Sequence, residues 1–453
     1  MLQLVKKLLH RLGVDKAIFY TSSGRIIQGA GAVVTVLFIV RYLTGIEQGF
    51  YYTFASILAI QVFFDLGLNG IITQYVAHEN AHIQWDERQM PDGDPRNISR
   101  EAYLLRFCIK WYSILAVALL VILLGVGLVY FKTFYRIDTH VSWVWPWMLL
   151  CVGTTLNFLI GPVAAFLEGL GKVRQIAQYR FYAQFAVVLI VWSGLYFGAR
   201  LYVGGISSIV SALIFVTWIL GSRHRKTLAS LLKVHVVEKV HYRLEIFPYQ
   251  WKIALSWMSG YFIFQLFNPV LFAFSGPVVA GQMGMTLAVL NGVSALSMSW
   301  ISTKVPMFSN LIAKGEYPAL DGVFNKTLRQ QIFICTVCVA VFILGVYVLE
   351  LSHRPERERL LAWLPLGLMA GSMVLNQLVY SWATYLRCHK QEPFLAYSVV
   401  GGVLCALSTF FLGKYVGVTG ITASYFLITA CLLPWAYYIF KTKKQQWHRM
   451  IPS

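Results

Sequence analysis

The sequence predicts an all-α polytopic membrane protein with about twelve transmembrane helices, arranged as two pseudo-symmetric six-helix bundles around a central cleft. Three observations predict this fold class: the apolar composition, the number of long apolar segments, and an internal repeat. Hydrophobic residues make up 58% of the 453 residues and charged residues only 13%, whereas a soluble domain carries about 25% charged residues. Most of the chain therefore cannot face water.

Apolar segments long enough to cross a bilayer recur along the whole chain. A helix needs about 20 apolar residues to cross the roughly 30 Å hydrocarbon layer, and charged, Gly-rich or Pro-containing stretches separate twelve such segments. The predicted spans are 24–44, 48–76, 108–131, 142–167, 173–197, 201–221, 251–274, 278–303, 329–350, 361–386, 393–413 and 418–440.

The distribution of basic residues predicts the orientation. The N-terminal segment 1–25 alternates leucines and basic residues at helical spacing, which is typical of an amphipathic helix on a membrane surface. If both termini are cytoplasmic, thirty of the 38 Lys and Arg residues fall on inner segments, as the positive-inside rule requires. The net charge of +19 then reflects topology and attraction to anionic lipids, and nucleic-acid binding is not indicated.

An internal repeat supports two related bundles. A shift of 219 residues aligns "PWMLLCVGTTLNFLIGPVAAFL" with "PLGLMAGSMVLNQLVYSWATYL" without a gap, and it pairs Pro146 with Pro365 and Asn157 with Asn376. Because six helices form an even number, the two copies share one orientation, and the repeat axis runs along the membrane normal. This is the arrangement in which two bundles rock around a central site.

The repeat divides the chain into three predicted parts. Residues 1–225 form a six-helix lobe with the N-terminal amphipathic segment, residues 226–250 a cytoplasmic linker, and residues 251–453 a second six-helix lobe. The linker region reads "RHRKTLASLLKVHVVEKVHYRLEIFPYQW" from position 222. We expect it to be a solvated, charged connection with some surface helix.

One carboxylate lies deep within a predicted span. Asp65 belongs to the stretch "FFDLGLNG", and a carboxylate at that depth must be neutral, paired, or turned away from lipid. Side chains at four-residue steps share one helix face. The polar face predicted here consists of Gln61, Asp65, Asn69 and Thr73.

Lipid does not accommodate such a polar face, so we expect it to line the cleft, with Asp65 as the counter-ion of Arg25 or Arg180. The alternative is a static ion pair that fixes the first span to the second. Asn157 and Asn376 are repeat-equivalent and either face the cleft or form helix-to-helix hydrogen bonds. The candidate substrate-binding residues are Arg25, Gln28, Gln61, Asp65, Asn69, Asn157, Arg180, Gln184 and Asn376, and Asp65 is also the candidate ion-coupling residue.

Three segments carry a family resemblance: "GIEQGFYYTFASILAIQVFFDLGLNG", "FLEGLGKVRQ" and "PMFSNLIAKGEY". They resemble the O-antigen type polysaccharide flippases of the multidrug, oligosaccharidyl-lipid and polysaccharide exporter superfamily, and the resemblance covers nearly the whole chain. It implies a multi-pass protein of the bacterial inner membrane, with both termini cytoplasmic. Such a protein flips a polyprenyl-pyrophosphate-linked oligosaccharide by alternating access, for surface polysaccharide biosynthesis.

The expected partners are this lipid-linked oligosaccharide, anionic membrane lipids and other polysaccharide assembly proteins, and no cofactor or metal is expected. One alternative is a cation-coupled multidrug exporter of the same superfamily. Another is an integral-membrane polysaccharide polymerase or glycosyltransferase. The outer connections are short and offer no paired carboxylates at a protected position, and Cys335 and Cys338 lie in an apolar helix. The sequence therefore favours transport over enzymatic chemistry.

Overall fold

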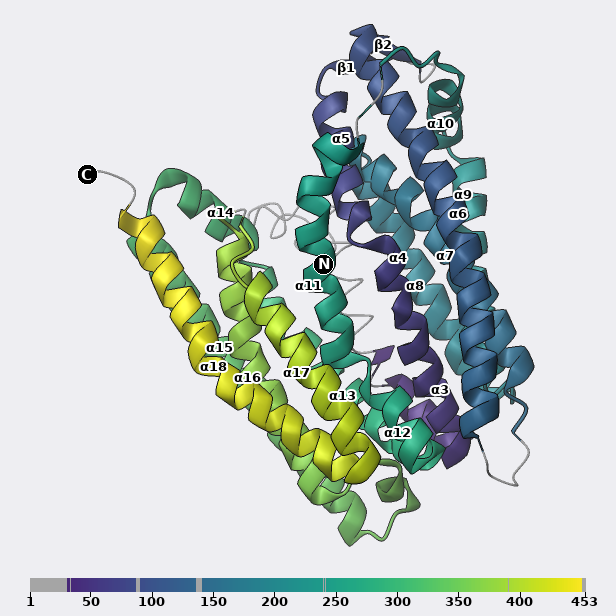
Figure 1. The fold of residues 1–453 in the computed structure, drawn as a ribbon, viewed down its shortest axis with the longest axis vertical. Coiled ribbons are helices and arrows are strands. Elements are labelled where there is room, and N and C mark those ends of the chain that lie inside the picture. Colours follow the sequence, from purple (N-terminus) through teal and green to yellow (C-terminus); the bar gives the residue numbers. More distant parts are fainter. Residues whose placement is uncertain are drawn as a thin grey trace, which may run out of the picture. The chain divides into compact units, whose positions relative to one another are not determined.

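The structure, a computed structural model, describes residues 31–449 except 33, 87–89, 136–140, 239, 241 and 390. The described part of the chain is helical apart from connections and one short antiparallel hairpin, in which β1 (Ile83–Trp85) pairs with β2 (Pro91–Gly93) (Figure 1). The predicted N-terminal surface helix lies outside the described residues.

The helices follow the predicted spans closely at most positions. In chain order they are α3 (Gly45–Leu58), η1 (Ala59–Gln61), α4 (Val62–Asp65), α5 (Leu68–Asn80), α6 (Pro95–Phe134), α7 (Val144–Gly169), α8 (Val173–Tyr196), α9 (Tyr202–Gly221), α10 (His224–Lys233), η2 (Tyr242–Ile246), α11 (Phe247–Phe264), α12 (Phe267–Ser275), α13 (Pro277–Ser302), α14 (Val305–Lys314), α15 (Tyr317–Leu351), η3 (Pro355–Arg359), α16 (Trp363–Arg387), α17 (Leu395–Tyr415) and α18 (Val418–Arg449).

The helices confirm the predicted class of multi-span membrane protein. In the described part of the chain, eight helices are long and apolar enough to cross a membrane, and a bent pair of helices raises this number to nine. Helices α8 and α16 are 24 and 25 residues long, which also suffices to cross the roughly 30 Å hydrocarbon layer.

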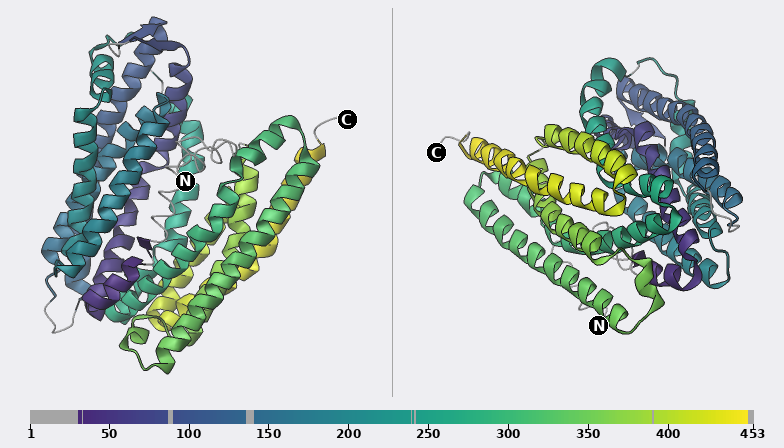
Figure 2. Two further views of the ribbon diagram at one scale, coloured as in Figure 1. Left: turned by 180° about the vertical axis from the view of Figure 1, so that it is seen from behind. Right: turned by 60° about the horizontal axis from the view of Figure 1, so that its bottom comes forward.

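The chain forms two compact units. Among the described residues, the first contains 31, 58–86, 90–133, 141–238, 240 and 242–257, and the second contains 32, 34–57, 134–135, 258–389 and 391–449. In the first unit α7 packs against α5 and α9; in the second, α16 and α17 pack against α18 (Figure 2). The predicted second span contributes residues 48–57 to the second unit and residues 58–76 to the first.

That second span is broken, so the prediction of one continuous helix over 48–76 is wrong. Leu66 and Gly67 have φ angles of 48° and 71°, and the helices on either side are bent by 41°. The left-handed conformation is readily available to glycine and costs other residues energy. A Cβ atom on Gly67 would also lie 2.5 Å from the Ile253 side chain, so a side chain here would both strain the backbone and crowd Ile253.

Side chains of α6 fasten the predicted linker to the first unit. The hydroxyl of Ser99 accepts the backbone N–H groups of Val237 and Glu238, both at 2.8 Å. The guanidinium of Arg106 donates to the carbonyl oxygens of Leu232 and Val234. Helix α10 is the expected surface helix, but the stretch after it is bound to α6 rather than freely solvated.

Arg100 strengthens this attachment by joining three carboxylates. Its guanidinium lies 2.9 Å from Glu79, 2.6 Å from Glu245 and 3.8 Å from Glu238. Glu79 belongs to α5, whereas the other two glutamates lie after α10. Arg100 therefore ties the broken span and the linker to α6 through one cation.

In the second unit, α3 and α13 approach closely through glycines. A Cβ atom on Gly49 would lie 2.0 Å from the carbonyl oxygen of Pro277, so the two backbones are in direct contact. The buried amide of Gln48 donates to the carbonyl oxygens of Gly281 at 2.8 Å and Arg359 at 3.1 Å. Small residues permit this approach where lipid offers no hydrophobic driving force between helices.

A comparable contact in the first unit pairs a glycine with an indole ring. Trp147 on α7 is completely buried, and a Cβ atom on Gly127 of α6 would lie 2.3 Å from its ring. The ring of Phe131 packs edge-on at 5.5 Å. The absence of a side chain at Gly127 therefore creates the space that the indole occupies.

Candidate functional site

Asp65 is held by uncharged hydrogen-bond donors inside the first unit. One carboxylate oxygen accepts a 2.7 Å bond from the Asn69 amide and a 2.7 Å bond from the Tyr112 hydroxyl. Tyr112 comes from α6 and is 1% exposed, and its ring packs 5.0 Å from Phe158 of α7. The carboxylate thus lies where three helical segments meet.

The break in the span places these groups. Helix α4 ends at Asp65, and after the left-handed turn α5 begins at Leu68, so Asn69 reaches back over the turn. One helical step further on, the Thr73 hydroxyl lies 3.0 Å from the Ala165 carbonyl oxygen of α7. The polar residues expected to form one regular stripe are therefore divided among η1, α4 and α5, and one of them, Thr73, fixes α5 near α7.

Arg180 does not pair with Asp65 in this structure. Its guanidinium lies 2.8 Å from the carboxylate of Glu168, and the Arg180 side chain is 58% exposed. Glu168 is near the end of α7, and the tight turn into α8 brings the two residues together. Of the two counter-ions predicted for Asp65, one thus has another partner, and Arg25 lies outside the described residues together with Gln28.

The two candidate asparagines make equivalent contacts. The Asn157 amide on α7 donates to the backbone oxygen of Ser208 on α9 at 2.7 Å, and the Asn376 amide on α16 donates to the hydroxyl of Tyr425 on α18 at 2.9 Å. Each side chain thus bridges corresponding helices of its own repeat. Helix-to-helix hydrogen bonding is present at both positions, and substrate contact there stays a prediction.

Gln61 and Gln184 show no such connection among the described residues. Gln61 ends η1 and is exposed, and Gln184 on α8 is half-buried. Their proposed contact with substrate also stays a prediction.

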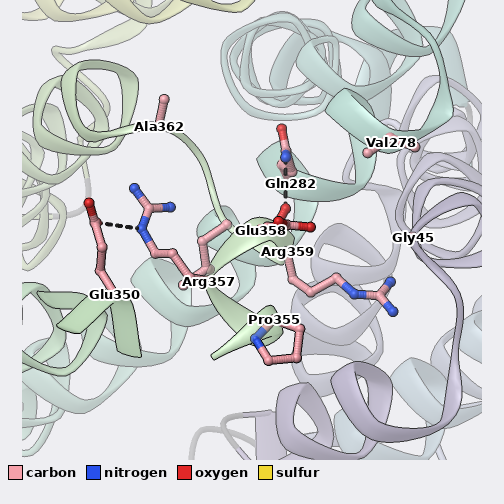
Figure 3. A pocket seen from close by; sticks show the side chains of 10 residues that line it. Gly45, Val278, Gln282, Glu350, Pro355, Arg357, Glu358, Arg359 and Ala362 are labelled. Atoms are coloured by element: carbon pink, nitrogen blue, oxygen red, sulfur yellow. Dashed lines mark hydrogen bonds and ion pairs between the residues drawn. The ribbon is translucent and has the colours of Figure 1, made fainter. Parts of the chain in front are cut away.

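A cavity of about 820 Å³ lies in the second unit, where the sequence indicated only a charged connection. Figure 3 shows Arg357 and Arg359 extending from one loop in different directions, the first toward Glu350 and the second toward Gly45. Gln282 reaches in from α13 and donates to the backbone oxygen of Glu358 at 2.7 Å. The cavity is lined by Gly45, Val278, Gln282, Glu350, Pro355, Arg357, Glu358, Arg359, Leu360 and Ala362.

Sequence reasoning missed both Tyr112 and this cavity. In the sequence, Tyr112 is one of many aromatic residues in an apolar span. Its hydrogen bond to Asp65 becomes visible only when α6 packs against the break. The alternating charges of "SHRPERER" indicate one wall of the cavity in the sequence. Its other walls come from α3 and α13, which are far away in the sequence.

Comparison with known proteins identifies the fold. No family model and no curated protein matches this chain. Among solved structures, an outward-facing multidrug resistance MATE family transporter of the MOP superfamily is 14% identical, with 95% of this chain and 96% of that chain covered and a TM-score of 0.58. An inward-facing structure described in the same words is 11% identical, with coverages of 97% and 96% and a TM-score of 0.55.

The chain has the fold of MATE transporters. A MOP superfamily transporter from Pyrococcus furiosus, described as having a binding pocket of reverse polarity that suggests a different function, is 12% identical, with 96% of both chains covered and a TM-score of 0.50. These matches extend over nearly the whole chain and confirm the predicted architecture of two pseudo-symmetric six-helix bundles.

Proposed function

We propose that this protein is an alternating-access transporter that flips a polyprenyl-pyrophosphate-linked oligosaccharide across the bacterial inner membrane, with both termini in the cytoplasm. The observation that carries transport is the MATE fold over 97% of the chain. The lipid-linked substrate rests on the sequence resemblance and on the predicted cations Arg25 and Arg180. Two guanidinium groups suit a pyrophosphate because they donate paired hydrogen bonds to its oxygens.

Asp65 is the proposed coupling residue. Its carboxylate lies at the break of a membrane-spanning segment and is held there by Asn69 and Tyr112. Both donors are neutral side chains and add no charge of their own. A proton or a metal cation that binds the Asp65 carboxylate therefore changes the net charge at this position. A charge change at a helix break can favour one arrangement of the two helical halves over another.

The function is tested with the purified protein in vesicles that carry a fluorescent lipid-linked oligosaccharide in one leaflet. We expect the wild-type protein to move this lipid between leaflets, and Asp65→Asn to reduce the rate at least tenfold. Asp92→Asn is the matched control because Asp92 is exposed on β2. Equal rates in the wild-type and Asp65→Asn proteins contradict coupling through Asp65, and no movement by the wild-type protein contradicts the flippase.

A second candidate function is multidrug export driven by a cation gradient. It is favoured by the structural neighbours, two of which are described as multidrug resistance transporters. The same vesicles loaded with a cationic dye discriminate the two functions. Dye export without movement of the lipid-linked oligosaccharide supports the exporter.

A further inference from the structure

The cavity of the second unit lies at the ends of candidate membrane-spanning helices, the level at which a bilayer places its headgroups. Its walls come from the ends of membrane-spanning helices: Gly45 begins α3, Glu350 precedes the last residue of α15, and Ala362 precedes α16. Nearby Leu351 and Leu364 are each 62% exposed. Apolar side chains this exposed beside charged ones mark the boundary between the hydrocarbon layer and the headgroups.

One of the two arginines in the cavity is already neutralised. The Nε of Arg357 lies 3.1 Å from the carboxylate of Glu350, and Nη1 donates to the Leu361 carbonyl oxygen at 2.8 Å. The indole of Trp363 donates to the same Glu350 carboxylate at 2.6 Å, and the guanidinium of Arg357 lies 5.0 Å from the centre of the Trp363 ring. Because these groups bond to one another and the two charges are opposite, little net charge is left for a ligand.

The other arginine is only partly satisfied. Nη2 of Arg359 donates to the Leu43 carbonyl oxygen at 2.9 Å, whereas Nη1 is buried and has no hydrogen-bond partner among the described residues. Burial lowers the pKa of Arg359, and the nearby carboxylates of Glu47 and Glu358 oppose this change. A buried, unused donor on a cation costs free energy that an anionic ligand could recover.

The carboxylate of Glu358 complements this cation. Glu358 is exposed and lines the cavity, and it is near enough to Arg359 to influence its pKa. No ion pair within 4.0 Å joins the two in the described chain, so beside the Arg357–Glu350 pair the cavity presents a second cation and a separate anion. Gln282 adds a neutral amide beside them.

We propose that this cavity binds the zwitterionic headgroup of a phospholipid, with the phosphate facing Arg359 and the ammonium group facing Glu358. Its volume of about 820 Å³ lies within the range of roughly 300 to 1,000 Å³ that is usual for small-molecule sites. Lipid surrounds the helix ends at this depth, so the ligand is always present at high concentration. This proposal does not depend on which substrate the protein transports.

Native mass spectrometry of the purified full-length protein tests the proposal with three added lipids: phosphatidylethanolamine, phosphatidylglycerol and diacylglycerol. We expect phosphatidylethanolamine to bind at least about tenfold more tightly than phosphatidylglycerol, and diacylglycerol to bind weakest. Arg359→Gln should weaken binding of both phospholipids at least about tenfold, because it removes a charge-assisted contact. Glu358→Gln should abolish only the preference for phosphatidylethanolamine.

Arg354→Gln is the matched control. Arg354 belongs to the same connection, is exposed and does not line the cavity, and its replacement changes the net charge as Arg359→Gln does. Glu358 is exposed, so its neutralisation tests the site even if Arg359→Gln fails to fold. Equal affinities for the two phospholipids in the wild-type protein, or an unchanged preference in Glu358→Gln, would overturn the proposal.

Discussion

The hydroxyl of Tyr112 donates a 2.7 Å hydrogen bond to the carboxylate of Asp65 and thereby joins α6 to the break between α4 and α5. Tyr112→Phe removes this donor and keeps the ring that packs against Phe158. A hydrogen bond to a charged group contributes about 1.5 to 3 kcal/mol. We expect a loss of stability in that range, measured by thermal unfolding of the purified protein in detergent.

Tyr182→Phe is the control for this change, because Tyr182 is 58% exposed and should lose its hydroxyl without measurable effect. If Tyr112→Phe and Tyr182→Phe unfold alike, the Tyr112 hydroxyl does not stabilise the break.

The contact between α3 and α13 predicts a strong effect of one methyl group. In Gly49→Ala the new Cβ atom would lie 2.0 Å from the backbone carbonyl oxygen of Pro277, and a backbone atom cannot turn aside as a flexible side chain can. Overpacking of this kind costs about 1 to 3 kcal/mol. We expect lower yield of folded protein, measured by size-exclusion chromatography of a fluorescent fusion.

Gly367→Ala provides the comparison within the same unit. A Cβ atom on Gly367 meets nothing within 4 Å, and alanine in a helix is favoured over glycine by about 1 kcal/mol. This variant should fold at least as well as the wild-type protein. Equal yields of Gly49→Ala and Gly367→Ala would show that α3 and α13 can separate at little cost.

The attachment of the linker can be measured by proteolysis. In Arg100→Ala, Glu79, Glu238 and Glu245 lose their shared cation, and a buried carboxylate left without its partner is strongly destabilising. We expect faster cleavage after Glu238 by a glutamate-specific protease. Arg96→Ala is the control, because Arg96 is exposed one turn earlier on α6; equal cleavage of both variants would contradict a role for Arg100.

His389 predicts how the second unit responds to acid. It lies in the connection after α16, and burial, together with the nearby His448, lowers its pKa to about 4. An unfolded histidine has a pKa of about 6.5, so the unfolded chain binds the proton more readily. The stabilisation is therefore complete above about pH 6.5 and is lost as the pH falls toward 4.

In His389→Phe the ring that stacks at 4.2 Å on Trp447 is kept and the titrating group is removed. We expect its unfolding temperature to fall less between pH 7 and pH 4 than that of the wild-type protein. His353→Asn should keep the wild-type acid dependence because His353 is exposed. An identical pH dependence of His389→Phe and the wild-type protein would rule out this residue as the cause.

The apolar segments predicted the fold class, and the internal repeat predicted that Asn157 and Asn376 are equivalent. Both features can be read directly from the amino-acid sequence. The partners of the two asparagines could not be predicted in the same way. The 219-residue shift carries Ser208 to position 427, which is a leucine, whereas the observed partner of Asn376 is Tyr425. The hydrogen bond is repeated between corresponding helices, but its acceptor is a backbone carbonyl oxygen on α9 and a hydroxyl on α18.

The candidate site shows the same limit. Asp65 is a candidate because burial of a carboxylate within an apolar span costs free energy. The same reasoning predicts that a charged side chain pairs with it. The described structure supplies neutral donors from Asn69 and Tyr112 instead, since the turn at Gly67 redirects the chain. A lone glycine in an apolar segment indicates neither the sign of its φ angle nor the neighbour that excludes a side chain.

The pairing of Trp147 with Gly127 also gives the molecule a spectroscopic reporter. The chain has 14 tryptophans, and several, such as Trp145 at 69% exposure, lie at the surface of the described structure. The fully buried indole of Trp147 should emit at shorter wavelength and be shielded from aqueous quenchers. Loosening of the α6–α7 contact would redden its fluorescence, and the difference between the emission of the wild-type protein and that of Trp147→Phe would separate this signal from the other tryptophans and report on this helix pair without an added label.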